Sequence, residues 1–305
     1  MEKKLSRRYF LSNGIKAAAI GALSTRFLSG CCKLCGEGKK YKIAVCDWSL
    51  GNKYQANPEA FDFAKSIGFD GVQVSSKFAK GKKEFFTKDQ ISAYKDKMSK
   101  LGMEVASTSP SGMSFLNDAD SVEFTKSAVE ASAALGGKAI LLPFFGKDKM
   151  SGEDFKMREE FFAPLVSKLK EVSPRAEELG IDICLENTLS SEENIRIMEA
   201  VGSPNVKVYF DTMNIEYYGH DAVPSILKLK GRIGEIHLKN IAHKLDASQN
   251  SMPKDFAGCL KAIRDIGYEG WLTLELHAHN PAKDGSVESV LRHNVQYLHD
   301  WIAKV

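Results

Sequence analysis

The chain has no excess of charge of one sign once its first thirty residues are set aside. Residues 1–30 hold six of the 42 Lys and Arg residues and one of the 39 acidic residues, which leaves a net charge of −2 on the rest. The overall charge of +3 therefore belongs to the N-terminal segment. The mildly acidic remainder lacks the basic surface that nucleic-acid binding requires, so we expect no nucleic-acid partner.

Several catalytic motifs are also missing. The sequence contains no GxSxG nucleophile elbow, no Walker-type phosphate loop in its main part and no dinucleotide fingerprint. Cysteines are scarce after residue 40, where Cys46, Cys184 and Cys259 are widely spaced. We interpret these three as buried thiols and expect no disulfide framework. We also expect no cysteine nucleophile, on the interpretation that no cysteine sits at a strand end with a histidine partner.

Long apolar runs are absent as well. The longest N-terminal candidate, residues 17–23, is too short to span a bilayer. It follows Ser6-Arg7-Arg8-Tyr9-Phe10-Leu11, which is a twin-arginine export motif. We therefore expect residues 1–30 to be a signal peptide, residues 31–40 a tether and residues 41–305 the folded domain.

A possible lipid anchor lies where the signal peptide ends. Leu28-Ser29-Gly30-Cys31 matches a lipobox, in which Cys31 is the lipidated residue. The alternative is ordinary signal cleavage that leaves Cys31 as a spare thiol. Either way we expect an exported protein, in the periplasm or anchored to a membrane of the cell envelope only through this lipid.

From Tyr41 onward, short apolar runs alternate with amphipathic segments. The expected strands begin near residues 43, 71, 104, 139, 182, 206, 233 and 271. The expected helices span residues 58–67, 88–101, 121–135, 153–179, 192–201, 222–229, 256–266 and 286–302, and the longest could extend over the barrel mouth. Glycine follows many of these helices, and no Pro/Gly/Ser-rich linker interrupts the pattern. Eight strand–helix units predict an α/β fold, a (β/α)₈ TIM barrel in a single domain.

Four residues that end predicted strands carry the functional information. Glu186, Asp211, His237 and Glu275 end the strand-like runs IDICLE, VKVYFD, GEIH and WLTLE. In each run the apolar residues fall on the opposite face, so the four side chains point into the barrel lumen. The C-terminal ends of barrel strands meet at one face, where these four would converge. Three carboxylates and one imidazole describe a site for Mn²⁺, Mg²⁺, Co²⁺ or a similar divalent ion.

Three more charged residues share the inward parity but lie deeper in the barrel. They are Asp182, Lys207 and Glu235. Buried charges must be paired, so we predict a buried ion network in the lower barrel with Lys207 between the two acids.

The sequence resembles the xylose isomerase-like TIM-barrel superfamily, the sugar isomerase/epimerase family, over residues 41–305. The resemblance lies in LEN at 185–187, FDTMN at 210–214, EIHLKN at 235–240 and GYEGWLTLELH at 267–277. The superfamily includes sugar isomerases, ketose 3-epimerases, inosose dehydratase and apurinic endonucleases. The resemblance implies one divalent ion, Mn²⁺ in the first place with Mg²⁺, Co²⁺ or Zn²⁺ as alternatives, held by the Glu/Asp/His/Glu set. It also implies that Glu186 and Glu275 act as the acid/base pair.

Further residues are candidates for substrate binding. Trp48 could stack on a sugar or pack the barrel mouth, and Lys239 shares the inward parity of His237. Glu192 matches a substrate-binding position of ketose epimerases by resemblance, but it also fits the start of a helix, where an acid is favoured. The remaining candidates are Asn187, Asn214 and His277.

The chain departs from two branches of this superfamily. The runs VQVSS and VASTS end without a histidine, and Asn214 replaces a family histidine, which argues against the apurinic endonucleases. The arginine that ketose epimerases carry soon after the strand-seven histidine is missing. Three functions stay open: an isomerase or epimerase of an unphosphorylated sugar, a lyase or hydratase of 3-keto-glycosides, and a non-catalytic sugar-binding lipoprotein.

Overall fold

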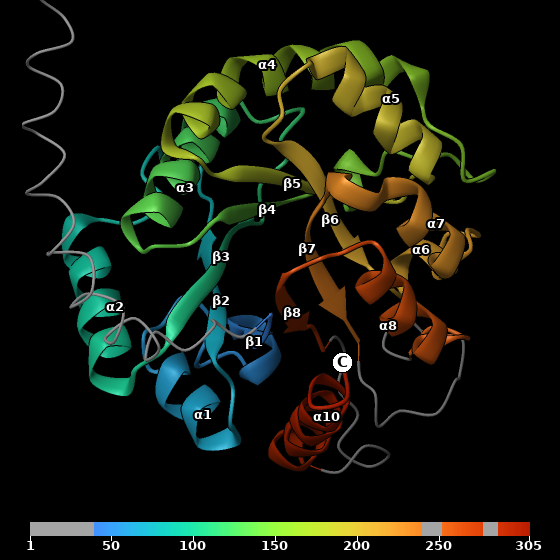
Figure 1. Cartoon of the computed structure of the whole chain (residues 1–305). Coiled ribbons are helices and arrows are strands. Elements are labelled where there is room, and N and C mark those ends of the chain that lie inside the picture. Colours follow the sequence, from blue (N-terminus) through green and yellow to red (C-terminus); the bar gives the residue numbers. More distant parts are fainter. Residues whose placement is uncertain (1–39, 240–251, 277–285) are drawn as a thin grey trace, which may run out of the picture. The chain divides into compact units, whose positions relative to one another are not determined.

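Eight parallel strands pair in chain order, and β8 pairs with β1 to close a barrel. The computed structural model describes residues 40–239, 252–276 and 286–305. Figure 1 shows the strands at the centre with the helices in a ring around them. The strands are β1 (Tyr41–Cys46), β2 (Gly71–Lys77), β3 (Glu104–Ser111), β4 (Ala139–Pro143), β5 (Asp182–Glu186), β6 (Val206–Asp211), β7 (Ile233–Leu238) and β8 (Gly270–Leu274). The predicted (β/α)₈ barrel is confirmed.

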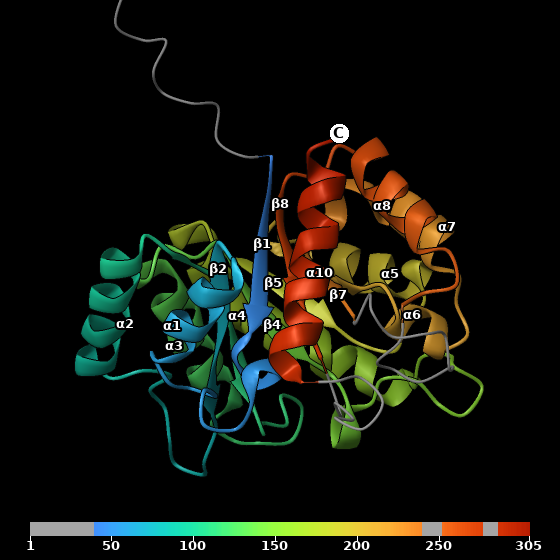
Figure 2. The same ribbon diagram turned by 90° about the horizontal axis from the view of Figure 1, so that it is seen from below.

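The helices follow the strands as expected. They are α1 (Ala60–Ile67), α2 (Lys88–Leu101), α3 (Ser121–Ala134), α4 (Phe162–Leu179), α5 (Ser191–Val201), α6 (Asn214–Tyr217), α7 (Ala222–Leu229), α8 (Phe256–Asp265) and α10 (Val287–Ile302). Short 3₁₀ turns are η1 (Asp47–Leu50), η2 (Gly146–Asp148), η3 (Glu159–Phe161) and η4 (Lys230–Arg232). The last helix packs beside β1, where the rings of Tyr41 and Trp301 lie 5.1 Å apart (Figure 2).

Local sequence fixes several helix ends. Thr87 and Ser190 each begin a helix with a capping box, in which side chain and backbone bond reciprocally. Gly102 and Gly180 end α2 and α4 with φ of 61° and 64°, a left-handed conformation that glycine adopts without strain. These local rules explain why most predicted helix bounds agree with the structure to within a residue or two.

The helix expected from residue 153 is shorter than predicted. Residues 153–158 form a turn, Ser151 and Met157 make an isolated antiparallel bridge, and α4 begins only at Phe162. Phe155 adopts φ of 59° in this turn, which helical backbone excludes. The acidic and amphipathic composition resembles that of a helix, but it does not reveal this break.

The lower barrel differs from the predicted ion network. Lys207 Nζ pairs with Asp182 at 2.8 Å, and both side chains are partly exposed. Glu235 is buried and instead accepts a hydrogen bond from the Tyr209 hydroxyl at 2.7 Å. Burial raises the pKa of Glu235 to about 8, so the carboxyl keeps its proton at neutral pH and needs no cation. The prediction that Lys207 lies between two acids is therefore wrong.

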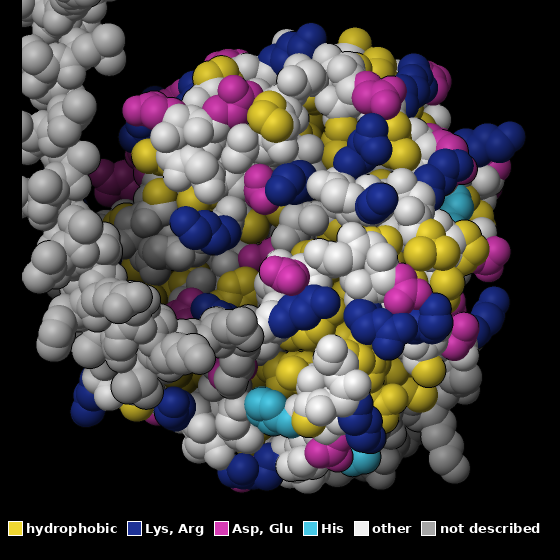
Figure 3. Space-filling model, viewed as in Figure 1, with side chains coloured by type: hydrophobic (Ala, Val, Ile, Leu, Met, Phe, Trp, Pro, Cys, Tyr) yellow, Lys and Arg dark blue, Asp and Glu magenta, His cyan; other side chains and the backbone are white. Residues whose placement is uncertain are grey.

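The surface carries both signs of charge, and the three cysteines of the described residues are free thiols. On the face in Figure 3, Lys and Arg side chains alternate with Asp and Glu, with hydrophobic side chains in small patches between them. Cys46, Cys184 and Cys259 are free and buried, as predicted. Within the described residues, no helix combines the length and apolar composition that crossing a membrane requires.

Candidate functional site

The structure brings the four predicted ligand residues together at the C-terminal end of the barrel. Glu186 and Asp211 are the last residues of β5 and β6, His237 is next to last in β7, and Glu275 follows β8 directly. One ligand atom from each lies within 4.8 Å of the others, and all four side chains are buried. Consecutive parallel strands end at the same edge, so four neighbouring strands supply one cluster.

The imidazole has a defined orientation. His237 Nδ1 lies 3.2 Å from Glu186 Oε1 and 3.3 Å from Glu275 Oε2, while Nε2 lies 2.8 Å from Gln73 Oε1. Because that amide oxygen can only accept, we assign the proton to Nε2. Burial lowers the pKa of this imidazole, but the neighbouring acidic groups more than offset that effect and hold the pKa well above its ordinary value, so Nδ1 also carries a proton in the metal-free protein. A metal ion would replace that proton and bind the Nδ1 lone pair, which points at the carboxylates.

Two neighbours of His237 were not identified from the sequence. Gln73 in β2 is fully buried, and Cys46 ends β1 with its thiol 3.0 Å from Gln73 Oε1 and 3.5 Å from His237 Nε2. The expectation that no strand-end cysteine has a histidine partner is therefore wrong. Burial raises the pKa of the Cys46 thiol to about 12, so it is no nucleophile. A polar residue at inward parity within the apolar run GVQV is the signal that could have revealed Gln73.

Lys239 supplies a single buried positive charge to the cluster. Its Nζ lies 2.6 Å from Asp211 Oδ2 and also pairs with Glu275 Oε2. Burial lowers the pKa of this ammonium, but the surrounding carboxylates more than offset the effect and hold the pKa above its ordinary value. Burial, and after it the neighbouring Glu275, raises the pKa of Glu186.

The donor set and the charge balance both fit a divalent cation. A metal ligand must be a neutral imidazole, and with His237 in that form three ionised carboxylates and one ammonium leave two negative charges, which one divalent ion would neutralise. Asp211 Oδ1 accepts from the backbone N–H groups of Met213 and Asn214 at 2.9 and 2.8 Å, so Oδ2 is the oxygen turned to the cluster. Oxygen ligands with one imidazole suit Mn²⁺, Mg²⁺, Co²⁺ or Zn²⁺.

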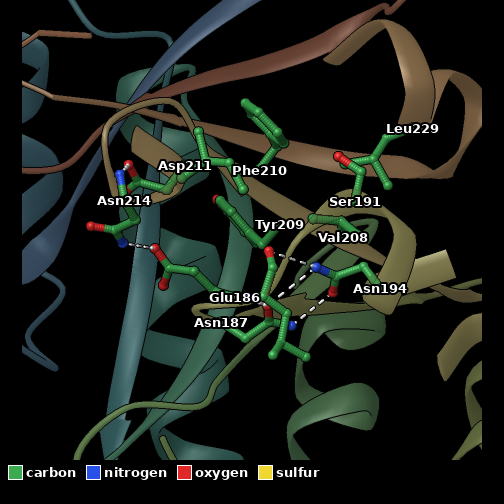
Figure 4. Close-up of a pocket in the computed structure, with 12 residues that line it drawn as sticks. Glu186, Asn187, Ser191, Asn194, Val208, Tyr209, Phe210, Asp211, Asn214 and Leu229 are labelled. Atoms are coloured by element: carbon green, nitrogen blue, oxygen red, sulfur yellow. Dashed lines mark hydrogen bonds between the residues drawn. The ribbon is translucent and has the colours of Figure 1, made fainter. Parts of the chain in front are cut away.

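Two substrate-binding candidates contact the carboxylates of the cluster. Asn214 Nδ2 donates to Glu186 Oε1 at 3.2 Å, as Figure 4 shows. Trp48 Nε1 donates to Glu275 Oε1 at 3.1 Å. Each carboxylate thus has one oxygen held by a neutral donor, which fixes its orientation.

Two other candidates lie away from the cluster. Asn187 turns from Glu186 toward Asn194, donating at 2.8 Å and accepting from the Leu189 N–H at 2.9 Å (Figure 4). Glu192 is exposed in the first turn of α5, where it pairs with Lys228. The structure therefore gives Glu192 the helix-start position that was its alternative. His277 and Cys31 lie outside the described residues, so their roles stay predictions.

A cavity of about 610 Å³ opens above the cluster at the barrel mouth. Glu186, Glu275, Trp48 and Asn214 line it. This volume falls within the ~300–1,000 Å³ range of small-molecule sites. The cluster is thus buried below a cavity that a small molecule can enter.

Comparisons with known proteins agree with this geometry. A family model described as xylose isomerase-like TIM barrel matches residues 61–300. An inosose dehydratase of Geobacillus thermodenitrificans is 22% identical over 279 residues, 82% of this chain and 83% of that protein. A D-psicose 3-epimerase of Enterocloster bolteae is 30% identical over 146 residues, 45% of this chain and 47% of that protein.

A solved structure shows the same fold. The crystal structure of a D-allulose 3-epimerase from Methylomonas sp., in complex with D-allulose, aligns with a TM-score of 0.66 at 17% identity. The alignment covers 86% of this chain and 97% of that protein. The matched family model spans most of the barrel. The chain belongs to the xylose isomerase-like TIM barrel family.

Proposed function

We propose that this protein is a divalent-metal-dependent enzyme that enolises an unphosphorylated sugar and thereby isomerises or epimerises it. The carrying observation is the buried set of Glu186, Asp211, His237 and Glu275, which opens to a cavity lined by two of its carboxylates. The named relatives, an inosose dehydratase and a D-psicose 3-epimerase, act on cyclitol or sugar substrates according to their names.

The positions of Glu186 and Glu275 suit proton transfer on both sides of a substrate. Glu186 ends β5 and Glu275 follows β8; these strands are separated around the closed barrel, and both residues line the cavity. One carboxylate would remove the proton from the carbon beside the carbonyl, and the other would return it from the opposite side. Asn214 and Trp48 hold one oxygen of each through hydrogen bonds.

The metal would be held by the four ligand residues, with His237 binding through Nδ1. Mn²⁺ is our first choice. When bound, the ion would polarise the sugar carbonyl and stabilise the negative charge of the enediolate. Lys239 would keep Asp211 and Glu275 in place, because its ammonium already bridges them.

A lyase or hydratase is the second candidate. The same base and cation would serve elimination, in which proton abstraction beside the carbonyl of a 3-keto-glycoside expels the neighbouring substituent. The inosose dehydratase supports this candidate because it matches over most of both chains. A third possibility, a sugar-binding lipoprotein without activity, predicts bound sugar without exchange.

The test is proton exchange with solvent. The full chain, loaded with Mn²⁺, would be incubated in D₂O with free ketoses and with 3-keto-glycosides, and the sugars followed by NMR. Deuterium beside the carbonyl with all atoms retained supports the isomerase or epimerase. Release of water or an aglycone supports the lyase.

Glu275→Gln is the variant that removes one of the two carboxylates without changing its size. We expect it to reduce exchange at least ~10²-fold, the usual effect of losing a general base. Glu269→Gln, in the turn before β8, is the control and should behave like the wild type. No exchange with any sugar, despite bound Mn²⁺, would refute the enzymatic proposal and favour the binding protein.

We further propose that the protein acts in the cell envelope. The twin-arginine motif at Arg7 and Arg8 supports export, and the lipobox supports a lipid on Cys31. Sugar phosphates are cytoplasmic, which is one reason for proposing an unphosphorylated substrate. Replacing Arg7 and Arg8 by Lys should leave the protein inside the cell on fractionation, and mass spectrometry of the N-terminal peptide should show a lipid that Cys31→Ala removes.

A further inference from the structure

The mouth cavity reaches well beyond the carboxylate cluster. Trp48 and Glu275 lie on its β1–β8 side, whereas Phe145 and Tyr218 follow β4 and α6 on the opposite side of the closed barrel. A cavity of about 610 Å³ lies in the range that holds drug-sized ligands, and a single hexose would leave part of it unfilled.

The side of the cavity away from Glu275 is aromatic. The rings of Phe145 and Tyr218 both line it, with centroids 6.5 Å apart and planes 29° from parallel. Two nearly parallel aromatic rings in a cavity wall offer faces on which a sugar ring or an aryl group can stack. Both residues are only partly buried, so their rings are accessible from the cavity.

A residue with strained backbone contacts the Tyr218 ring of this wall. Phe155 has φ of 59°, an unfavourable conformation for a bulky side chain, and remains 38% exposed. Its ring meets that of Tyr218 edge-on at 6.3 Å, and Gly219 leaves room for it, since a Cβ there would lie 3.1 Å from Phe155. Strain of this kind persists where the surrounding structure enforces it, often at binding sites.

The charges of the lining residues narrow the ligand class. Of the described residues that line the cavity, the charged ones are Glu186 and Glu275, and the others are aromatic, small or neutral. A phosphate or carboxylate on the ligand would find no basic partner among them, and the ammonium of Lys149, 5.6 Å from the centroid of the Tyr218 ring, is not one of the lining groups. The wall therefore suits an uncharged ring.

We propose that Phe145 and Tyr218 form a second subsite, which binds the second ring, sugar or aryl, of a neutral glycoside whose carbonyl-bearing ring lies at the carboxylate cluster. This inference rests on the proposed function and specifies its substrate class: two-ring glycosides in preference to free monosaccharides. Phe145 and Tyr218 would raise the affinity for two-ring glycosides. Glu186 and Glu275 would still carry out the proton transfer.

The test compares two ligands that differ only in the aglycone. Calorimetry with the full chain, loaded with Mn²⁺, would measure the Kd of methyl and of phenyl 3-keto-β-D-glucopyranoside, and NMR in D₂O would follow exchange in the same samples. We expect the phenyl glycoside to bind about tenfold more tightly, as one stacked ring contributes.

The variants separate stacking from general damage. Tyr218→Ala and Phe145→Ala should each reduce the phenyl preference severalfold and leave the Kd of the methyl glycoside unchanged, whereas Tyr218→Phe keeps the ring and the preference. Tyr297→Ala, which removes an exposed ring on α10, is the matched control and should change nothing. An unaltered phenyl preference in both alanine variants would overturn the subsite, as would equal affinities in the wild type.

The same experiments distinguish an error in the proposed subsite from an error in the proposed enolisation. Exchange that is equally fast with the methyl and phenyl glycosides, together with equal affinities, refutes the subsite and supports the proposed function. A phenyl preference that depends on Tyr218 without exchange in either glycoside supports the subsite and refutes the enolisation.

Discussion

The two ends of the barrel lumen bury similar side chains in different ways. At the C-terminal end, three carboxylates surround His237, two of them pair with the ammonium of Lys239, and all of these groups are buried. At the N-terminal end, Asp182 has Lys207 as its own partner at 2.8 Å, and both are partly exposed to water. The second acid there, Glu235, keeps its proton and accepts a hydrogen bond from the Tyr209 hydroxyl.

This difference shows which buried acids require a metal ion. Charge at the lower end is balanced by one ion pair and one protonated carboxyl, so a cation would gain little there. At the mouth, with His237 neutral as a metal ligand must be, two further positive charges are needed to balance the carboxylates. The presence of acidic residues alone would predict a metal site at both ends of the lumen. The balance of charge predicts one only at the mouth.

The largest effect is expected from removing a ligand carboxylate at the mouth. Asp211→Asn should weaken Mn²⁺ binding more than the ~10–100-fold that loss of an outer hydrogen bond causes, because one charge and one ligand atom disappear. Calorimetric titration with Mn²⁺ measures this. Asp182→Asn, the same change at the lower end, should leave the affinity within about twofold, and equal losses in the two variants would contradict the comparison.

The second largest effect is expected on the free energy of unfolding, when the buried ammonium of Lys239 is removed. Lys239→Met should destabilise the metal-free protein by about 3–5 kcal/mol, because the carboxylates lose their buried partner. Mn²⁺ should recover most of this loss, since it supplies positive charge at the same place. Urea unfolding with chelator and with Mn²⁺ tests both statements.

The lower end offers a matched control for that variant. Lys207→Met removes an ammonium from a partly exposed pair, which contributes about 1 kcal/mol or less, and Mn²⁺ should not restore it. A loss in Lys239→Met that persists unchanged in Mn²⁺ would show that the ammonium and the ion do not share a role.

Asp47 shows a third way to bury a carboxylate, by donors alone. It accepts from the N–H groups of Ser75 and Ala56 at 2.8 and 2.9 Å, yet burial raises its pKa from 3.8 to about 6. The folded state then holds this proton more tightly than the unfolded state. Its contribution of about 3 kcal/mol is complete below pH 4 and is lost as the pH rises through 6.

Asp47→Asn isolates this pH dependence, because the amide cannot titrate. The free energy of unfolding of the wild type relative to the variant should fall by about 3 kcal/mol between pH 3 and pH 7. Urea unfolding at several pH values measures it. Parallel profiles for the two proteins would mean that the backbone donors compensate fully for burial.

A smaller effect should follow from loss of the residue that orients the imidazole. Gln73→Leu removes the acceptor for His237 Nε2–H and should weaken Mn²⁺ binding ~10–100-fold. In the metal-free protein, at a pH high enough to make the imidazole neutral, nitrogen NMR of His237 should show the Nε2–H tautomer in the wild type and a mixture in the variant. Cys46→Ala removes the other neighbour of Nε2 and should have the weaker effect. An unchanged tautomer in Gln73→Leu would contradict the assignment.

The sequence predicts the ligand cluster because barrel geometry is regular. Alternation in each strand places Glu186, Asp211, His237 and Glu275 inside, and consecutive strand ends bring them to one edge. Neither rule requires knowledge of side-chain contacts. The same regularity explains why the eight strands and most helix bounds agree with expectation.

Contacts between particular side chains are what the sequence leaves open. Parity places Glu235 and Lys207 in the lumen, but it does not say that Tyr209 is nearer to Glu235 than the ammonium is. Asn187 follows Glu186 by one residue, and so it faces the helices and Asn194. Gln73 is neutral and isolated in the sequence, and its role depends on packing across the barrel.

The central claim is that the mouth cluster holds one divalent ion. Crystals grown with Mn²⁺ would test it through anomalous scattering at the manganese edge. We predict one strong peak surrounded by Glu186, Asp211, Glu275 and His237 Nδ1. The Nε2–H of His237 should still donate to Gln73 Oε1. A structure with no peak there and Lys239 still bridging Asp211 and Glu275, at Mn²⁺ concentrations that support activity, would contradict the account.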